Sequence, residues 1–326
     1  MFIATHELDL PRYNPEAKGN RSMAIDAELT QEGIITNSPI KKLQKFYKGL
    51  SSLPWIWVSI LLVVLVIPAV FAPLIAPHDP YEGDISIRLA PPVWYEGGSW
   101  DHILGTDRLG RDLLSRLIYG SRIALFVSMT ALLVSATVGT TLGLLSGWYG
   151  GWVDHLIQRL VDIKSSIPAI LLALIFVSIF GPSIFIAISI IAIFLWNRYT
   201  RLIRAETLAL RNMDFIARAR VSGASTTRIL IKHILPNVAN TLIVLATLEV
   251  GTVIILESTL SFLGVGIPRP IPSWGVMVSD GRNYLAVAWW IAILPGAGIF
   301  FTVLSLNLFG DWLRDHLDPK LRQVRR

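Results

Sequence analysis

Long apolar segments constrain this chain more than any other feature of its sequence. A helix needs roughly 20 predominantly apolar residues to cross the hydrocarbon core of a bilayer, and six segments offer such a core or its greater part. Charged residues make up only 16% of the chain, whereas a water-soluble domain carries about 25%. Too few polar side chains remain to cover a water-facing surface. The sequence therefore predicts an all-α, polytopic membrane protein with six transmembrane helices.

Tryptophans, glycines and prolines delimit these segments. Trp55 and Trp57 open the first one, where indole rings favour the membrane interface. Gly181-Pro182 predicts a tight turn between the third and fourth, and Pro295-Gly296 is expected to break the sixth. The expected spans are 54–76, 119–147, 153–181, 183–203, 237–262 and 286–310.

The distribution of Lys and Arg predicts the orientation, because cytoplasmic loops of membrane proteins carry an excess of these residues. With both termini in the cytoplasm, that side holds 22 Lys and Arg, the other side holds six, and Arg122 lies near the outer interface. We therefore expect both termini to be cytoplasmic. The polar stretch 77–115 is then an ordered extracytoplasmic loop. The same bias accounts for the net charge of +6 without a nucleic-acid partner.

The chain lacks the patterns of common catalytic and cofactor sites. It has no cysteine, which excludes disulfides and thiolate metal sites. The segment 105–112, "GTDRLGRD", lacks phosphate-loop spacing, and neither a zinc-protease motif nor a nucleophile elbow is present. We expect no catalytic, cofactor-binding or metal-binding residue in the chain. Nor do we expect a metal-spaced cluster among the histidines, which are His6, His78, His102, His155, His233 and His316.

The segment 214–237 predicts two short helices joined at a glycine. Asp214 can cap the first helix and Ser225 the second, which would cover 226–232. Gly223 between them takes positive φ without steric cost. One face would be apolar and the other basic. Such a helix pair either lies on anionic lipid or docks a soluble partner, and the residues alone leave both alternatives open.

This segment resembles the coupling loop, or EAA loop, of binding-protein-dependent ABC importer permeases. The family pattern is Glu-Ala-Ala, three residues, Gly, nine residues, a variable apolar position, one residue, and Leu-Pro. This chain offers Ala217-Arg218-Ala219, Gly223, His233 and Leu235-Pro236 at that spacing. Ala217 stands in place of the Glu and Arg218 in place of the first Ala. The coupling residues implied by the resemblance are Phe215, Ala217, Arg218, Ala219, Arg220, Gly223, Ala224, His233, Leu235 and Pro236.

Further segments are similar to the dipeptide, oligopeptide and nickel branch of that family. They are 104–125, 147–174, 257–266, 272–282 and 307–322, so the resemblance covers about 50–322. It implies a type I importer permease fold in the cytoplasmic (inner) membrane of a prokaryote. The implied parts are a cytoplasmic tail, the first helix with its loop, a five-helix permease core carrying the coupling loop, and a C-terminal tail. These cover 1–50, 51–118, 119–311 and 312–326.

The resemblance also implies partners and a function. A second permease subunit would pair with this one, two cytoplasmic ATPases would bind ATP and Mg²⁺ below it, and an extracytoplasmic solute-binding protein would deliver peptides. The chain itself would hold no cofactor. A self-sufficient channel or secondary transporter, or a membrane-embedded enzyme, is the alternative. A secondary transporter would favour inverted repeats with helices broken at the bilayer midplane. A membrane-embedded enzyme would need a set of catalytic residues at bilayer depth. The sequence offers neither.

Two further patterns have more than one interpretation. Glu249 and Glu257 lie in the fifth span, about 80° apart around a helix. Both carboxylates can therefore line a translocation pathway, or they can have a structural role as ion-pair partners or helix caps. Gly139, Gly143 and Gly147 recur on one helix face, where they favour close packing inside the chain over a dimer interface. Asp162 and Lys164 are expected to pair with other spans.

Overall fold

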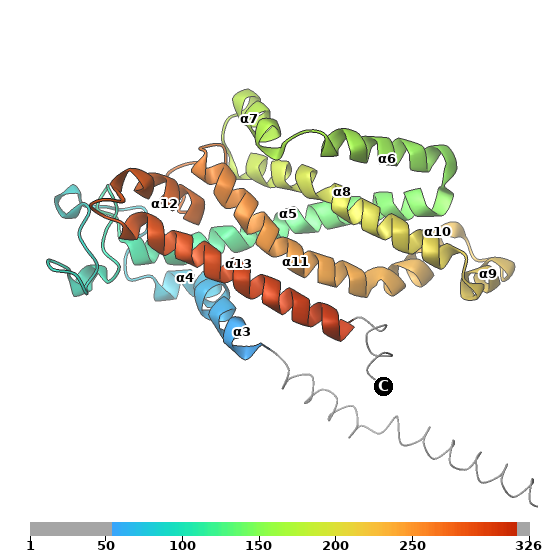
Figure 1. The fold of residues 1–326 in the computed structure, drawn as a ribbon, viewed down its shortest axis with the longest axis horizontal. Coiled ribbons are helices and arrows are strands. Elements are labelled where there is room, and N and C mark those ends of the chain that lie inside the picture. The colour runs from blue at the N-terminus through green and yellow to red at the C-terminus, as the bar shows by residue number, and fades with distance from the viewer. Residues whose placement is uncertain (1–53, 318–326) are drawn as a thin grey trace, which may run out of the picture. The chain divides into compact units, whose positions relative to one another are not determined.

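The computed structural model describes residues 54–317, and the predictions for the tails before and after them lie outside that range. The regular secondary structure of the described part is helical, apart from one antiparallel bridge between Thr106 and Asp112 (Figure 1). Five of its helices are long and apolar enough to cross a membrane, and a sixth span results if one sharply bent pair counts as one. The prediction of a polytopic, all-helical membrane protein is confirmed.

The first span consists of α3 (Trp55–Leu61), a π-helical turn (Leu62–Val66) and α4 (Ile67–Ile75). An ordered loop follows, with 3₁₀ turns at Ile85–Ile87 and Trp100–His102. Figure 1 shows this loop at one end of the bundle.

Buried charges hold the loop against the start of the longest helix, α5 (Leu113–Tyr149). The guanidinium of Arg116 is buried, donates to the carbonyl oxygen of Pro80 at 3.0 Å and lies 3.6 Å from Asp107. Asp107 also pairs with Arg111 at 2.7 Å. A buried charge is tolerated only when it is paired and hydrogen-bonded, so these contacts fix the path of the loop.

Helix α5 packs along α8 (Ile184–Arg211) over much of its length (Figure 1). A Cβ on Gly139 would stand 2.6 Å from Cβ of Tyr199, one on Gly143 would stand 2.8 Å from Cβ of Ile203, and one on Gly147 would stand 2.7 Å from Cβ of Thr207. Any side chain there would force the helices apart. The three glycines therefore face α8 within the same chain, and the close approach depends on them.

The segment expected as one helix over 153–181 is instead α6 (Gly151–Ser165) and α7 (Ala169–Phe180), bent by 86°. The expectation of a continuous helix was wrong because Pro168 has no N–H to donate and forces the residue before it out of the helical region. Asp162 pairs with Arg201 at 2.9 Å, and Lys164 bonds Asn197 at 3.1 Å. The expected pairing of these two side chains with another span is thus confirmed, and their partners lie on α8.

After α8, the chain forms α9 (Asp214–Val221), α10 (Thr226–Ile229), a π-helical turn (Leu230–Ile234) and α11 (Leu235–Phe262). The second helix of the loop was expected to end before the fifth span, but it runs directly into it. The wider π-helical turn precedes Pro236 near the first turn of α11, where a missing N–H costs little. Asp214 lies inside α9 and does not cap it.

The last part of the chain contains α12 (Trp274–Gly281) and α13 (Trp290–Leu317). The sequence predicted only a loop where α12 forms. Pro295 was expected to break the sixth helix, but α13 continues through it and on to Leu317, beyond the expected end at 310. The indole nitrogen of Trp274 donates to the carbonyl oxygen of Leu117 at 3.0 Å, which attaches α12 to α5.

Candidate functional site

The α9–α10 segment lies at the end of the bundle opposite the polar loop that follows α4 (Figure 1). Its anchor is Ile216, which is fully buried in a small apolar cluster with Leu144 of α5 and Ile203 of α8. Ile229 and Leu230 join the same cluster. Side chains of both short helices thus share one apolar cluster with side chains of α5 and α8.

Gly223 makes the turn between the two short helices. Its φ of +76° is in the left-handed region, which favours glycine. The N–H of Gly223 donates to the carbonyl oxygen of Arg220 at 2.9 Å, and the N–H of Ala224 donates to that of Ala219 at 3.1 Å. Ser225 then accepts from the N–H of Arg228 and caps the second helix, as predicted. The helix–glycine–helix geometry thus forms from local interactions.

The coupling residues that the resemblance implies fall into an exposed set and a half-buried set. The exposed members are Ala217, Arg218, Arg220, Gly223 and Pro236, and the half-buried members are Phe215, Ala219, Ala224, His233 and Leu235. The structure therefore brings the first set to the surface. The apolar members of the second set pack against the apolar cluster around Ile216. Sequence reasoning missed Val221, an apolar side chain that is 90% exposed beside this surface.

Two further contacts hold the segment in place. The guanidinium of Arg220 stacks 4.5 Å from the ring centre of Trp148, a favourable cation–π contact. Arg211, at the end of α8, donates to the carbonyl oxygens of Gly147 and Trp148. A basic residue that binds the last carbonyls of a neighbouring helix satisfies groups that the helix end leaves open. Trp148 thus connects α5 to both α8 and α9, a role that only the folded structure reveals.

The two carboxylates of α11 have different surroundings. Glu249 is 4% exposed and pairs with Arg198 of α8 at 2.6 Å. Glu257 is 1% exposed and accepts from the hydroxyl of Ser261 at 2.7 Å. Ser261 in turn accepts the N–H of Ile267 at 2.9 Å, so Glu257 supports the turn after α11. A pathway role for the two carboxylates stays a prediction.

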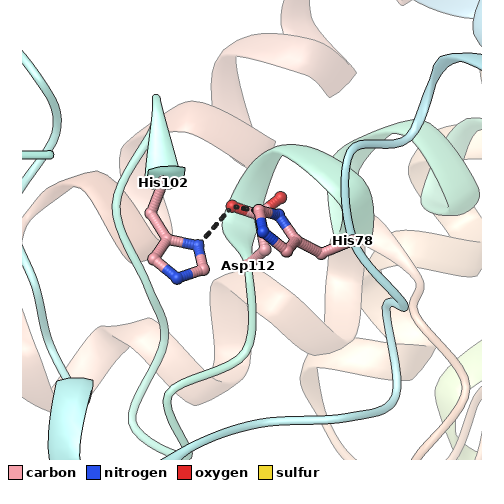
Figure 2. Close-up of side chains that lie close together, drawn as sticks. All are labelled: His78, His102 and Asp112. Carbon is pink, nitrogen blue, oxygen red and sulfur yellow. Dashed lines mark hydrogen bonds and ion pairs between the residues drawn. The ribbon is translucent and has the colours of Figure 1, made fainter. Parts of the chain in front are cut away.

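The polar loop contains a cluster that the sequence analysis did not predict. His78, His102 and Asp112 place one potential metal-ligand atom each within 4.8 Å of one another (Figure 2). The expectation that the histidines form no metal-spaced cluster was therefore wrong for these two. His102 lies ten residues before Asp112 and His78 lies further upstream, and the folding of the loop onto α5 brings the three side chains together.

The apolar spans and the α9–α10 segment define a multi-pass helical membrane protein with a surface segment anchored in the bundle. Residues 139–323 match the family described as "Binding-protein-dependent transport system inner membrane component". Residues 57–92 match the "N-terminal TM domain of oligopeptide transport permease C". Because the first match covers more than half of the chain, the chain belongs to this family of inner membrane components of binding-protein-dependent transport systems.

Curated relatives resemble the chain over almost its whole length. The dipeptide transport system permease protein DppC of Escherichia coli (strain K12) is 44% identical over 299 residues, which is 91% of this chain and 100% of that protein. The di/tripeptide transport system permease protein DppC of Pseudomonas aeruginosa (strain UCBPP-PA14) is 40% identical over 300 residues, which is 92% of this chain and 98% of that protein.

A solved structure of the MetNI methionine ABC transporter, in an inward-facing conformation, has a similar fold. The TM-score is 0.50 at 18% sequence identity, and the match covers 63% of this chain and 98% of the other. At this identity the likeness concerns the fold alone.

Proposed function

We propose that the chain is a permease subunit of an ATP-binding-cassette importer that moves di- or oligopeptides across the cytoplasmic membrane of a prokaryote. The observation that carries the proposal is the full-length match to dipeptide permeases. The anchored α9–α10 segment at one end of the bundle supports it. In this proposal the chain contributes no catalytic residue. Its partners are a second permease subunit, two ATPases that bind ATP and Mg²⁺, and an extracytoplasmic solute-binding protein.

The loop 214–237 is the part that we propose to couple ATP hydrolysis to transport. Arg218 and Val221 extend from α9 into solvent, where a cleft on an ATPase can receive them. Ile216 on the opposite face is buried in the apolar cluster that includes Leu144 of α5 and Ile203 of α8. Movement of the ATPases would therefore shift the whole helix pair and bias the spans between two states.

The topology that accompanies this function has six spans and both termini in the cytoplasm. The bent pair α6–α7 counts as one of the spans in this arrangement. The absence of natural cysteines allows a direct test. In Ser99→Cys, a membrane-impermeant maleimide should label intact cells, whereas Ser222→Cys should be labelled only after permeabilisation. Both serines are exposed, and the reverse pattern would refute the orientation.

The test of function combines co-purification with uptake of a radiolabelled dipeptide. Gly223→Pro demands a φ near −65° where the chain has +76°, and it removes the N–H that bonds Arg220. Gly181→Pro is a matched control, because Gly181 also has φ +76° and donates its N–H, here to Val177, but lies in the turn before α8.

We expect the wild-type chain to co-purify with a second permease and with ATPases, and uptake to require ATP. Gly223→Pro should lose the ATPases and uptake but keep the second permease, whereas Gly181→Pro should keep the ATPases. Uptake by the chain alone, without ATP, would refute the importer and favour a channel or secondary transporter. Equal loss of ATPases in both variants would refute the role of the loop.

A further inference from the structure

Three side chains converge in the polar loop from three separate segments. His78 follows the end of α4, His102 closes the second 3₁₀ turn, and Asp112 is the N-cap residue of α5. Figure 2 shows both imidazole rings next to the carboxylate. The ring centres lie 4.7 Å apart. Neither the coupling loop nor the packing of the spans involves these side chains.

The spacing of the donor atoms fits a small metal ion. Nδ1 of His102 lies 3.0 Å from Oδ1 of Asp112, and Nδ1 of His78 lies 3.9 Å from the same oxygen. Zinc binds nitrogen and oxygen at about 2.0–2.2 Å in a tetrahedron, which places neighbouring ligand atoms roughly 3.3 Å apart. Small rotations of the two imidazoles are therefore enough to bring all three atoms to bonding distance of one ion.

The carboxylate is held in position by groups that a metal would not displace. Oδ2 of Asp112 accepts both the N–H and the hydroxyl of Ser115, each at 2.7 Å, and the side chain of Asp112 is fully buried. The hydroxyl of Ser115 also accepts the backbone N–H of His78 at 3.0 Å. Oδ1 remains directed toward the imidazoles. Such outer hydrogen bonds orient the ligands of metal sites.

The surrounding cavity favours a cation. It has a volume of about 340 Å³, and its lining includes His78, His102 and Asp112 together with Asp79, Glu82 and Asp84. No Lys or Arg is among the lining residues. The backbone N–H of Ser86 bonds the carboxylate of Asp84 and holds its pKa below the usual range, so this group is ionised at neutral pH. The carboxylates therefore give the cavity a negative charge.

We propose that His78, His102 and Asp112 bind a divalent transition-metal ion of the zinc class. Two imidazoles and one carboxylate suit Zn²⁺, Ni²⁺ or Co²⁺, whereas Mg²⁺ and Ca²⁺ prefer oxygen ligands. Water or a carboxylate of the cavity completes the coordination. The ion fastens the exit of the first span to the start of α5. The competing interpretation is a hydrogen bond from His102 to Asp112 without any metal.

The test measures metal bound to the detergent-purified transporter complex, isolated through a tag without histidines. The complex is stripped with a chelator, equilibrated with Zn²⁺ and freed of excess metal, and its zinc is counted by mass spectrometry. His78→Gln removes an imidazole whose side chain is 41% exposed and leaves the His102–Asp112 hydrogen bond intact. His102→Asn removes the second imidazole.

Two matched controls distinguish this site from others. Asp101→Asn changes an exposed carboxylate next to His102, and His155→Gln removes an exposed imidazole of α6. The wild type and both controls should retain about one more zinc per chain than His78→Gln and His102→Asn. With Co²⁺ in place of zinc, only the wild type and the controls should show the visible absorption of a bound ion.

Added Zn²⁺ should also raise the midpoint of thermal unfolding of the wild type but not of His78→Gln, because a ligand stabilises the state that binds it. Equal zinc in the wild type and both imidazole variants would overturn the proposal. So would a wild type that keeps no zinc, or loss of zinc in His102→Asn alone. Because His78→Gln keeps the loop's other contacts, its metal content reports on ligation separately from folding.

Discussion

Gly139→Ala is the substitution whose cost the structure predicts most directly. A Cβ at this position would stand 2.6 Å from Cβ of Tyr199 and closer still to the carbonyl oxygen of Trp196, whereas ordinary contact begins at 3.4 Å. The oxygen belongs to the backbone, so a change of rotamer cannot relieve the clash. Helix α8 has to retreat by about 1 Å, which loosens packing along its length. Overpacking of this kind costs about 1–3 kcal/mol.

Gly251→Ala provides the matched comparison. Gly251 lies inside α11 against α13, and a Cβ there would meet its nearest neighbour, Oδ1 of Asn307, at 3.4 Å. Both substitutions gain the same helix propensity, about 0.5–1 kcal/mol relative to glycine, so the difference between them isolates the steric cost. We expect Gly251→Ala to be neutral or stabilising and Gly139→Ala to be less stable than it by about 1–3 kcal/mol.

The assay heats the purified protein in mild detergent and measures the fraction that stays monodisperse at each temperature. The midpoint for Gly139→Ala should fall several degrees below that for Gly251→Ala. Equal midpoints would refute the reasoning, because they would mean that the two helices separate without cost.

Three further substitutions test the polar contacts between helices. Arg198→Met leaves the buried carboxylate of Glu249 without its partner and should lower the free energy of unfolding by about 1–3 kcal/mol. Adding Glu249→Gln should restore part of the unfolding midpoint. A double variant that is no more stable than Arg198→Met alone would contradict this prediction. Asp154→Asn weakens the two 2.6 Å hydrogen bonds from Arg204 that join α6 to α8, and a loss of about 1–2 kcal/mol should appear in the same unfolding assay. Trp274→Phe keeps an apolar ring but removes the hydrogen bond from the indole nitrogen to the carbonyl oxygen of Leu117. A loss of about 0.5–1.5 kcal/mol is expected, and an unchanged unfolding midpoint would show that this bond is dispensable.

The local sequence determined those features that depend on neighbouring residues. Apolar length fixed the class of protein, because a bilayer admits helices and excludes exposed polar backbone. Gly223 and Ser225 predicted the turn and the cap between the two short helices, since both depend on interactions within a few residues. Motif spacing indicated the family, which the comparisons confirmed.

Helix ends and continuity were predicted less well, because packing competes with local preference. Pro168 bends the chain sharply between α6 and α7, whereas Pro295 leaves α13 continuous. The two prolines differ little as residues. The bundle around α13 holds that helix together, because neighbouring segments bury and support it. A proline therefore marks a position where a helix can break, and tertiary contacts decide whether it does.

Only the tertiary structure decided which distant residues meet. It placed three small residues of α5 against α8, paired Arg198 with Glu249 across two helices, and brought His78 and His102 to Asp112. These partners lie ten or more residues apart in the sequence and follow no local spacing rule. Their contacts form because the buried charges of the loop and the close packing of the helices fix the segments relative to one another. The sequence alone thus defined a membrane permease, and the fold defined the contacts that hold it together and the metal site that we propose.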